Sequence, residues 1–306
     1  MRIAVLGAGA MGSLFGGRLA LAGFAVELID VNQAHIDAVA ADGLRLEADD
    51  GDHRIPVAIG RAEAFGEPVD LLIVFTKGPH TAAALASVGH LIGPETWGLT
   101  LQNGLGNGER LAHVIPASRV LIGMTNWPAD VRGAGHVHTH GDGEVKLWSQ
   151  DGADSATLRA VAEALSTAGL NAKADPETPA AIWEKAAFNA AMNSIAAITG
   201  FTVGRMADDP DIPLIAAAVV AETVAVAQAL KIPVSHERIR AAVAHAYAEH
   251  RPHKPSMLQD VLAGRPTEIE AINGAIFAHA QRSGVAVPTV ETLLRLVRAK
   301  ERQGRL

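Results

Sequence analysis

A line of polar side chains on an otherwise apolar segment is the feature of this sequence best suited to chemistry. Lys185, Asn189 and Asn193 are four residues apart within the stretch from Ala181 to Ile195, so on an α-helix they share one face, with a drift of about 40° per step. Burying an asparagine without a hydrogen-bond partner is costly. The partner of these two is either neighbouring backbone or a bound polar substrate. With a substrate, Lys185 would supply a proton or a positive charge to a ketone, because partial desolvation lowers a lysine pKa toward the range of a general acid.

A second polar cluster lies further along the chain, in residues 254–260 and 264–270. Ser256 and Thr267 are both placed to cap helices, and Glu270 follows Thr267 at the spacing of a capping box. This structural interpretation does not account for Glu268. Its carboxylate is placed to pair with Lys185 or to bind a substrate hydroxyl.

A glycine-rich loop opens the chain. Gly7 suits a tight turn, Gly9 lets backbone approach a pyrophosphate, and Gly12 lets a helix pack against a strand. The helix that follows offers unpaired N–H groups to phosphates. The pattern predicts a dinucleotide site whose loop residues are Gly7, Ala8, Gly9, Ala10, Met11 and Gly12.

The choice of dinucleotide depends on Asp30, which ends the second predicted strand. A carboxylate there accepts hydrogen bonds from the adenosine ribose and repels a 2'-phosphate. Sites for NADP usually place an arginine nearby, whereas residues 31–33 carry no positive charge. The sequence therefore predicts NAD(H) or NADP(H) and favours NAD(H). Two alternatives stay open: Asp30 only caps the next helix, or Lys77, after a later strand, contacts a phosphate.

Composition narrows the classes of partner. The 306 residues are 49% hydrophobic and 19% charged, which suits a globular protein of two domains. The 26 basic and 33 acidic residues give a net charge of -7 with no long run of one sign, so a small molecule is expected as partner, and neither nucleic acid nor a membrane surface. The absence of cysteine excludes disulfides, thiolate nucleophiles, iron–sulfur clusters and cysteine-ligated zinc.

For two other groups of residues, the sequence predicts no ligand. His136, His138 and His140 would line up on one face of a strand at metal-ligand reach, but no acidic partner is placed beside them, and we expect a surface role and no metal. A basic C-terminal end suits the dipole of a last helix and is assigned no partner. Its residues are Arg295, Arg298, Lys300, Arg302 and Arg305.

Short apolar runs alternate with helical stretches in the first half of the chain. Because these runs do not alternate apolar with polar residues, they are typical of a parallel sheet covered by helices on both faces. The segment Gly133–Trp148 does alternate and predicts a hairpin or antiparallel extension. The predicted strands are Arg2–Leu6, Ala25–Asp30, Asp70–Phe75, Gly98–Leu101 and Val120–Met124, and Met11–Ala22 is the first helix.

Beyond Asp175 the pattern becomes helical. Pro176 and Pro179 mark the change, so we predict a dinucleotide-binding domain over residues 1–176 and a helical substrate domain over residues 177–306. The expected fold is an α/β, Rossmann-like, doubly wound domain followed by an all-α domain. The predicted helices are Pro179–Thr199, Ile212–Leu230, His236–His250, Glu268–Ser283 and Thr289–Arg302.

The apolar N-terminus does not predict a signal peptide. Glycines interrupt Met1–Leu21, and Arg18 breaks the run before the roughly 20 residues that a bilayer span needs. We expect no other stretch to be long enough to span a membrane. We therefore expect a soluble, cytoplasmic protein.

Together these motifs resemble the ketopantoate reductase family, in the same order over nearly the whole chain. They are the glycine loop, Leu101–Gly106, Trp183–Lys185 with the two asparagines, and the two polar segments that contain Ser256 and Glu268. The resemblance implies Lys185 as the general acid for the keto oxygen, with Glu268 beside it and the substrate hydroxyl. It also implies Asn189, Asn193 and Ser256 as substrate contacts, and Asn103 near the nicotinamide.

The resemblance implies reduction of a 2-keto acid, most simply 2-dehydropantoate to pantoate in pantothenate biosynthesis, in a cleft between the domains. One departure concerns the cofactor. The resemblance implies NADPH for many members, which have an arginine just after the second strand, whereas this chain has Asp30 and Val31 there. Relatives that use NAD include dehydrogenases of branched or aromatic D-2-hydroxy acids, which is the first alternative. A non-catalytic dinucleotide sensor is the second. The oligomeric state is open, and a homodimer is allowed for.

Overall fold

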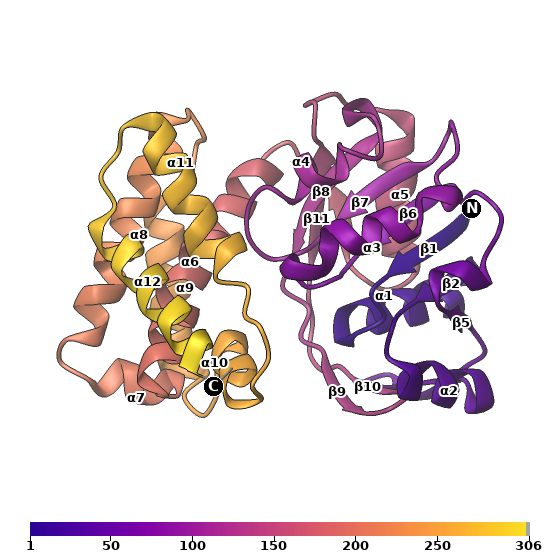
Figure 1. Cartoon of the computed structure of the whole chain (residues 1–306), viewed down its shortest axis with the longest axis horizontal. Helices are drawn as coiled ribbons and strands as arrows, with labels where there is room; N and C mark the ends of the chain where they lie inside the picture. Colours follow the sequence, from indigo (N-terminus) through magenta and orange to yellow (C-terminus); the bar gives the residue numbers. More distant parts are fainter. Residues whose placement is uncertain (304–306) are drawn as a thin grey trace. The chain divides into compact units, whose positions relative to one another are not determined.

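The chain forms two compact units (Figure 1). The structure is a computed structural model that describes residues 1–303, so Arg305 lies outside the described residues. The first unit is Met1–Gln102 with Asn107–Thr178, and the second is Asn103–Gly106 with Pro179–Leu306. The short segment Asn103–Gly106 thus belongs to the helical unit, whereas the sequence analysis placed it in the first domain.

An eight-stranded sheet forms the centre of the first unit, in the order β12-β11-β8-β7-β6-β1-β2-β5. The neighbours from β5 to β8 pair in parallel, and β11 runs antiparallel to β8. This topology confirms the Rossmann-like prediction. The strands are β1 (Arg2–Leu6), β2 (Ala25–Ile29), β5 (Ala58–Gly60), β6 (Leu71–Val74), β7 (Trp97–Thr100), β8 (Val120–Thr125), β11 (Val145–Ser149) and β12 (Ala172–Ala174).

Helices cover both faces of this sheet, which explains why central strands such as β1 and β6 are almost entirely apolar. Ile3 and Val5 of β1 pack in one core cluster with residues of α1 and α5. Ala4 and Leu6 pack in another, with residues of α3 and α4. The helices are α1 (Ala10–Leu21), α2 (Gln33–Asp42), α3 (Thr81–Ser87), α4 (Asn107–Leu111) and α5 (Ala156–Thr167).

A small second sheet, absent from the sequence prediction, has the order β4-β3-β10-β9. It lies beside α2 in Figure 1. Of the two alternatives predicted for Gly133–Trp148, the hairpin is not formed, because β10 pairs with β9 and β3. The antiparallel extension is confirmed, because β11 runs antiparallel to β8 in the main sheet. The strands are β3 (Leu44–Ala48), β4 (Gly51–Ile55), β9 (Asp130–Gly133) and β10 (His136–His138).

The alternating histidines lie on and after β10. His136 Nε2 is 3.1 Å from Glu47 Oε2, and the rings of His138 and His140 stack with centroids 5.5 Å apart. Within residues 1–303, no group of three or more histidine, aspartate or glutamate side chains could hold a metal ion. These histidines pair and stack with their neighbours on the second sheet.

The second unit is helical. The long helix α6 carries a row of small and apolar residues into its core, including Ala187, Ala190 and Ile195. Around it in Figure 1 lie α8, α9, α11 and α12. The elements are α6 (Thr178–Thr199), α7 (Val203–Asp208), α8 (Ile212–Ala229), α9 (His236–Glu249), α10 (Ser256–Leu262), a π-helical turn η5 (Glu270–Gly274), α11 (Ala275–Ser283) and α12 (Pro288–Gln303).

Helix α8 corrects one expectation. By length and composition it could cross a membrane, with a mean hydropathy of 1.8, so the prediction that no later stretch is long enough was wrong. Of that stretch, 44% is buried inside the protein, and Val219, Val220 and Thr223 lie fully within the fold. A core helix of a soluble protein passes the same test, so this single helix is weak evidence for a membrane span.

Candidate active site

The glycine loop joins β1 to α1 and is held tightly at both ends. Gly7 has a φ of +94°, and its N–H donates to the carbonyl of Ile29, at 2.8 Å. A Cβ atom on Gly12 would lie 1.9 Å from the carbonyl oxygen of Gly7. Only glycine lets α1 begin this close to the turn, as the sequence predicted for these positions.

Gly9 lies between these two packed glycines and has the opposite surroundings. It is exposed, and a Cβ atom built on it would meet nothing within 4 Å. Its backbone therefore presents an open surface at the N-terminus of α1. Such a surface fits the pyrophosphate of a dinucleotide, because the helix dipole and the free N–H groups both favour an anion there.

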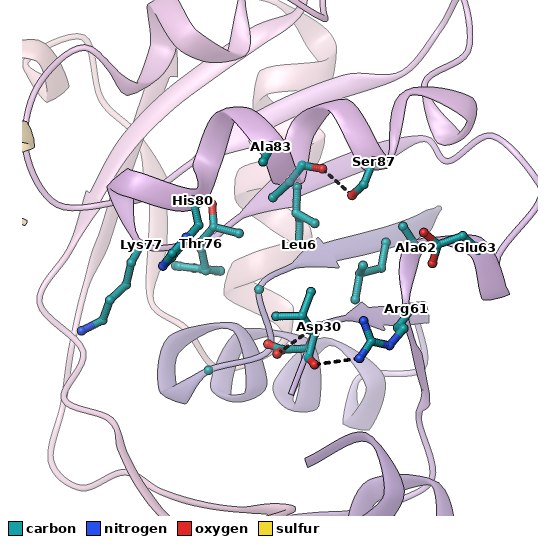
Figure 2. Close-up of a pocket in the computed structure, with 16 residues that line it drawn as sticks. Leu6, Asp30, Arg61, Ala62, Glu63, Thr76, Lys77, His80, Ala83 and Ser87 are labelled. Carbon is teal, nitrogen blue, oxygen red and sulfur yellow. Dashed lines mark hydrogen bonds between the residues drawn. The ribbon is translucent and has the colours of Figure 1, made fainter. Parts of the chain in front are cut away.

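A pocket of about 460 Å³ extends from this loop (Figure 2). It lies beyond the carboxyl ends of β1, β2 and β6, which is where open α/β sheets bind ligands. Apolar side chains from Leu6, Ile29 and Phe75 line it, together with Ala62 of η1 (Ala62–Ala64) and two alanines of α3, Ala83 and Ala84. Its polar lining residues are Asp30, Arg61, Glu63, Thr76, Lys77, His80 and Ser87.

Asp30 is fixed at the end of β2 by its own backbone. Its Oδ1 accepts hydrogen bonds from the N–H groups of Val31, at 2.7 Å, and Asn32, at 2.8 Å. The side chain of Asn32, not Asp30, caps α2 by accepting from the N–H of His35. The interpretation of Asp30 as a helix cap was therefore wrong, and its carboxylate lines the pocket instead.

Arg61 is a pocket residue that the sequence analysis missed. Its guanidinium donates to the carbonyl of Val31, at 3.3 Å, and to Oε1 of Gln33, at 3.4 Å. Figure 2 shows it directed at the corner formed by Asp30, while the side chain of Lys77 extends away from that corner. Arg61 reaches the pocket because the short strand β5 pairs with β2 and ends just before it, a pairing that the sequence does not signal.

Lys185 is a strongly perturbed basic group of the helical unit. It is partly buried on α6, and desolvation of its amine lowers the pKa to about 8, although the carboxylate of Glu268 opposes that shift. A lysine with this pKa holds a proton at neutral pH and releases it readily. The predicted pairing of Lys185 with Glu268 is thus present as an electrostatic interaction.

Glu268 lies just before the π-helical turn η5, and not in a first helical turn as predicted. Its Oε2 accepts a hydrogen bond from Nδ2 of Asn103, at 3.3 Å. The capping box predicted for Thr267 and Glu270 is not formed, because Glu270 pairs with Arg298 at 2.6 Å. Thr267 and Glu270 therefore do not cap, as a pair, the helix that follows Glu268.

Asn103 reaches Glu268 because its loop is docked on η5. The N–H of Leu105 donates to the carbonyl of Ala271, at 2.8 Å. Gly104 has a φ of +90°, and a Cβ atom there would lie 2.2 Å from the same carbonyl oxygen. The close approach of Gly104 explains why the loop belongs to the helical unit.

The two asparagines of α6 are buried, as the polar stripe predicted, with exposed fractions of 7% for Asn189 and 6% for Asn193. Nδ2 of Asn193 donates to Oγ of Ser256, at 3.4 Å. Ser256 is exposed and begins α10, whose cap position is Pro255, so the prediction that Ser256 caps this helix was wrong. Its hydroxyl instead meets the polar face of α6.

Neighbouring polar residues have structural partners. Glu184 accepts from the N–H of Ser235, at 2.7 Å, and pairs with Arg238, which ties α6 to α9. Asn273 of η5 is fully buried and donates to Ser194, at 3.5 Å. Sequence reasoning missed Asn273, because a π-helical turn has no periodicity that distinguishes it from the helix that follows.

Comparison with known proteins identifies the family of this chain. The sequence model described as ketopantoate reductase PanE/ApbA matches residues 3–152, and its C-terminal counterpart matches residues 178–301. The chain is 33% identical over 302 residues to a 2-dehydropantoate 2-reductase of Streptococcus pyogenes, covering 98% of both chains. It is 34% identical over 308 residues to that of Halobacterium salinarum, covering 99% of this chain and 100% of the relative.

A solved structure is similar over the full length. The ternary structure of D-mandelate dehydrogenase with NADH and anilino(oxo)acetate has a TM-score of 0.95 and 32% identity, with 100% of both chains covered. The two matched domains and the full-length relatives show that this chain belongs to the ketopantoate reductase family of oxidoreductases, whose cofactor is a nicotinamide dinucleotide.

Proposed function

We propose that this protein reduces 2-dehydropantoate to pantoate, a 2-keto acid to a 2-hydroxy acid, with Lys185 as the proton donor. The observation that carries the proposal is the partly buried ammonium of Lys185, with a pKa of about 8, interacting with the carboxylate of Glu268. When bound, the nicotinamide supplies the hydride, and the protein supplies position and charge.

Each polar residue of the helical unit has a separate task in this proposal. The ammonium of Lys185 donates a proton to the keto oxygen, which becomes the new hydroxyl. Glu268 stabilises that ammonium and accepts a hydrogen bond from the substrate hydroxyl. Asn189, Asn193 and Ser256 bind the remaining polar groups of the substrate, supported by the hydrogen bond between Asn193 and Ser256.

The cofactor is assigned to the first unit. The loop from Gly7 to Gly12 binds the pyrophosphate, supported by the open backbone at Gly9. Asp30 binds the adenosine ribose, and Lys77 contacts a phosphate. Asn103 is assigned to the nicotinamide end, where its amide would contact the cofactor as well as Glu268.

A second candidate is an NAD-dependent dehydrogenase of branched or aromatic D-2-hydroxy acids. It is favoured by the similarity to D-mandelate dehydrogenase with NADH, at a TM-score of 0.95. Both candidates use Lys185 for proton transfer. Its ammonium donates a proton when the keto acid is reduced, and its neutral amine accepts a proton when the hydroxy acid is oxidised.

The two candidates differ in steady-state rates on a small panel of keto acids. We expect the highest kcat/KM with 2-dehydropantoate, at least about tenfold above phenylglyoxylate and a branched 2-keto acid, a gap of about 1.4 kcal/mol in transition-state binding. A preference for phenylglyoxylate would replace the proposal by the second candidate. No turnover of any panel member, with NADH still bound, would leave a dinucleotide sensor.

Asp30 gives a prediction about the cofactor. Changing Asp30→Asn removes the negative charge but keeps an acceptor for the N–H groups of Val31 and Asn32. We expect the ratio of kcat/KM for NADPH over NADH to rise about tenfold or more, because the repulsion of the 2'-phosphate is lost. Asp30→Ala, which also removes the backbone hydrogen bonds, should shift the ratio in the same direction. An unchanged ratio in both variants would show that Asp30 does not select the cofactor.

A further inference from the structure

The corner of the dinucleotide pocket beside Asp30 contains a positive charge. Arg61 follows β5, the edge strand next to β2, and the N–H of Asp30 donates to the carbonyl of Gly60, at 3.1 Å. The ends of the two strands therefore hold Asp30 and Arg61 as neighbours on the pocket lining (Figure 2). An acid and a base thus lie side by side where the adenosine ribose is assigned.

The guanidinium of Arg61 retains capacity to bind an anion. Its two hydrogen bonds, to Val31 and Gln33, are long and go to neutral oxygens. Within the described part of the chain, no carboxylate lies within ion-pair distance of Arg61, although Asp30 and Glu63 line the same pocket. A guanidinium has five N–H donors, so several remain for a ligand.

We propose that Arg61 is a specificity-determining residue that lets this pocket accept an adenosine carrying a 2'-phosphate. The planar guanidinium matches a phosphate bidentately, whereas a ribose hydroxyl gains much less from it. Asp30 acts in the opposite direction, so the preference between the two dinucleotides is the difference between two adjacent charges. The inference rests on the proposed function only in placing the adenosine end of the dinucleotide in this pocket.

No other cation of the pocket suits this role as well. The side chain of Lys77 extends away from Asp30 in Figure 2. His80 lines the pocket from η2 (Gly78–His80), between β6 and α3, and not from the strand beside β2. The arginine at this corner therefore comes from the turn after the edge strand β5, and not from the residues directly after β2.

Binding of two adenosine nucleotides to the full chain tests the proposal without any turnover. The probes are 5'-AMP and adenosine 2',5'-bisphosphate, which differ only in the 2'-phosphate, measured by titration calorimetry. Arg61→Ala should weaken binding of the bisphosphate about tenfold or more and binding of 5'-AMP less than about threefold. Arg61→Lys should recover part of the loss, because it keeps the charge without the planar fork.

A matched control is Arg54→Ala. Arg54 is an exposed arginine of β4 in the same unit, and it lines a different surface hollow. This variant should bind both nucleotides as the wild type does. The selective effect of Arg61→Ala should also shrink as salt is raised, since the interaction is between exposed charges.

The remaining outcomes overturn the proposal in distinguishable ways. If Arg61→Ala weakens the binding of both nucleotides equally, the guanidinium contacts a part that they share or supports the fold. If it weakens the binding of neither, the guanidinium does not bind the 2'-phosphate. Absence of binding of both probes to the wild type would also remove the dinucleotide site from the proposed function. If the wild type binds both nucleotides but turns over no keto acid, the proposed function is refuted and the inference about Arg61 stands.

Discussion

Replacing Lys185 by alanine is expected to lower kcat by about 10²- to 10⁴-fold, the range that a general acid contributes. The affinity for NADH should change little, because the residues assigned to the pyrophosphate and the adenosine belong to the first unit, whereas Lys185 belongs to the helical one. Steady-state kinetics measures kcat, and fluorescence titration measures the affinity for NADH. An equal loss of NADH affinity would mean that Lys185 is misassigned.

A matched control and a pH profile separate proton transfer from structure. Lys231→Ala removes an exposed lysine from the same unit and should leave kcat unchanged. Since Lys185 has a pKa of about 8, the rate of reduction should be level below pH 8 and fall above it, as the ammonium is lost. Oxidation needs the neutral amine, so its rate should rise up to pH 8 and then level. A reduction rate that rises through this range would contradict the proton-donor role.

Two glycines of the same loop should respond to alanine in opposite ways. Gly12→Ala places a Cβ atom 1.9 Å from the carbonyl oxygen of Gly7, and backbone cannot move aside cheaply. We expect a loss of about 3 kcal/mol or more in the free energy of unfolding, at the upper end of the range for overpacked sites, and loss of NADH binding with it. Chemical denaturation and NADH titration measure these effects.

Gly9→Ala supplies the comparison. Its Cβ atom would meet nothing within 4 Å, and its φ of -68° is ordinary for alanine, so stability should hardly change. NADH binding should still weaken about tenfold or more, because the methyl group would stand where backbone approaches the pyrophosphate. Unchanged NADH affinity in Gly9→Ala would place the pyrophosphate elsewhere.

Much of the fold was predictable from the first unit's strands. Ile3 and Val5 pack on one face of β1 while Ala4 and Leu6 pack on the other, and a strand buried on both faces has no polar positions to interrupt it. The second sheet was not predictable, because β4 has a single large apolar residue, Ile55, and the apolar residues of β3 alternate over only five positions. Burial on one side only left a pattern too short to assign.

The candidate site was predictable where a residue type conflicts with its surroundings. Asn189 and Asn193 are conspicuous because an amide on an apolar helix requires a partner. Arg61 gave no such conflict, since an arginine after a turn is ordinary, and its position depends on the register of β5 against β2. The docking of Asn103 on the helical unit likewise depends on Gly104 meeting Ala271, a contact between segments far apart in the sequence.

The π-helical turn Glu270–Gly274 makes chain length matter as much as residue type. A turn of this kind holds one residue more than an α-helical turn, and a shift of one residue rotates a helix by about 100°. Deleting a single residue there would let the turn relax to an ordinary α-helix. The residues just before the turn would then rotate about the helix axis relative to α11. Glu268 and the carbonyl that holds Leu105 would then both face new directions, although no side chain of the site had been altered.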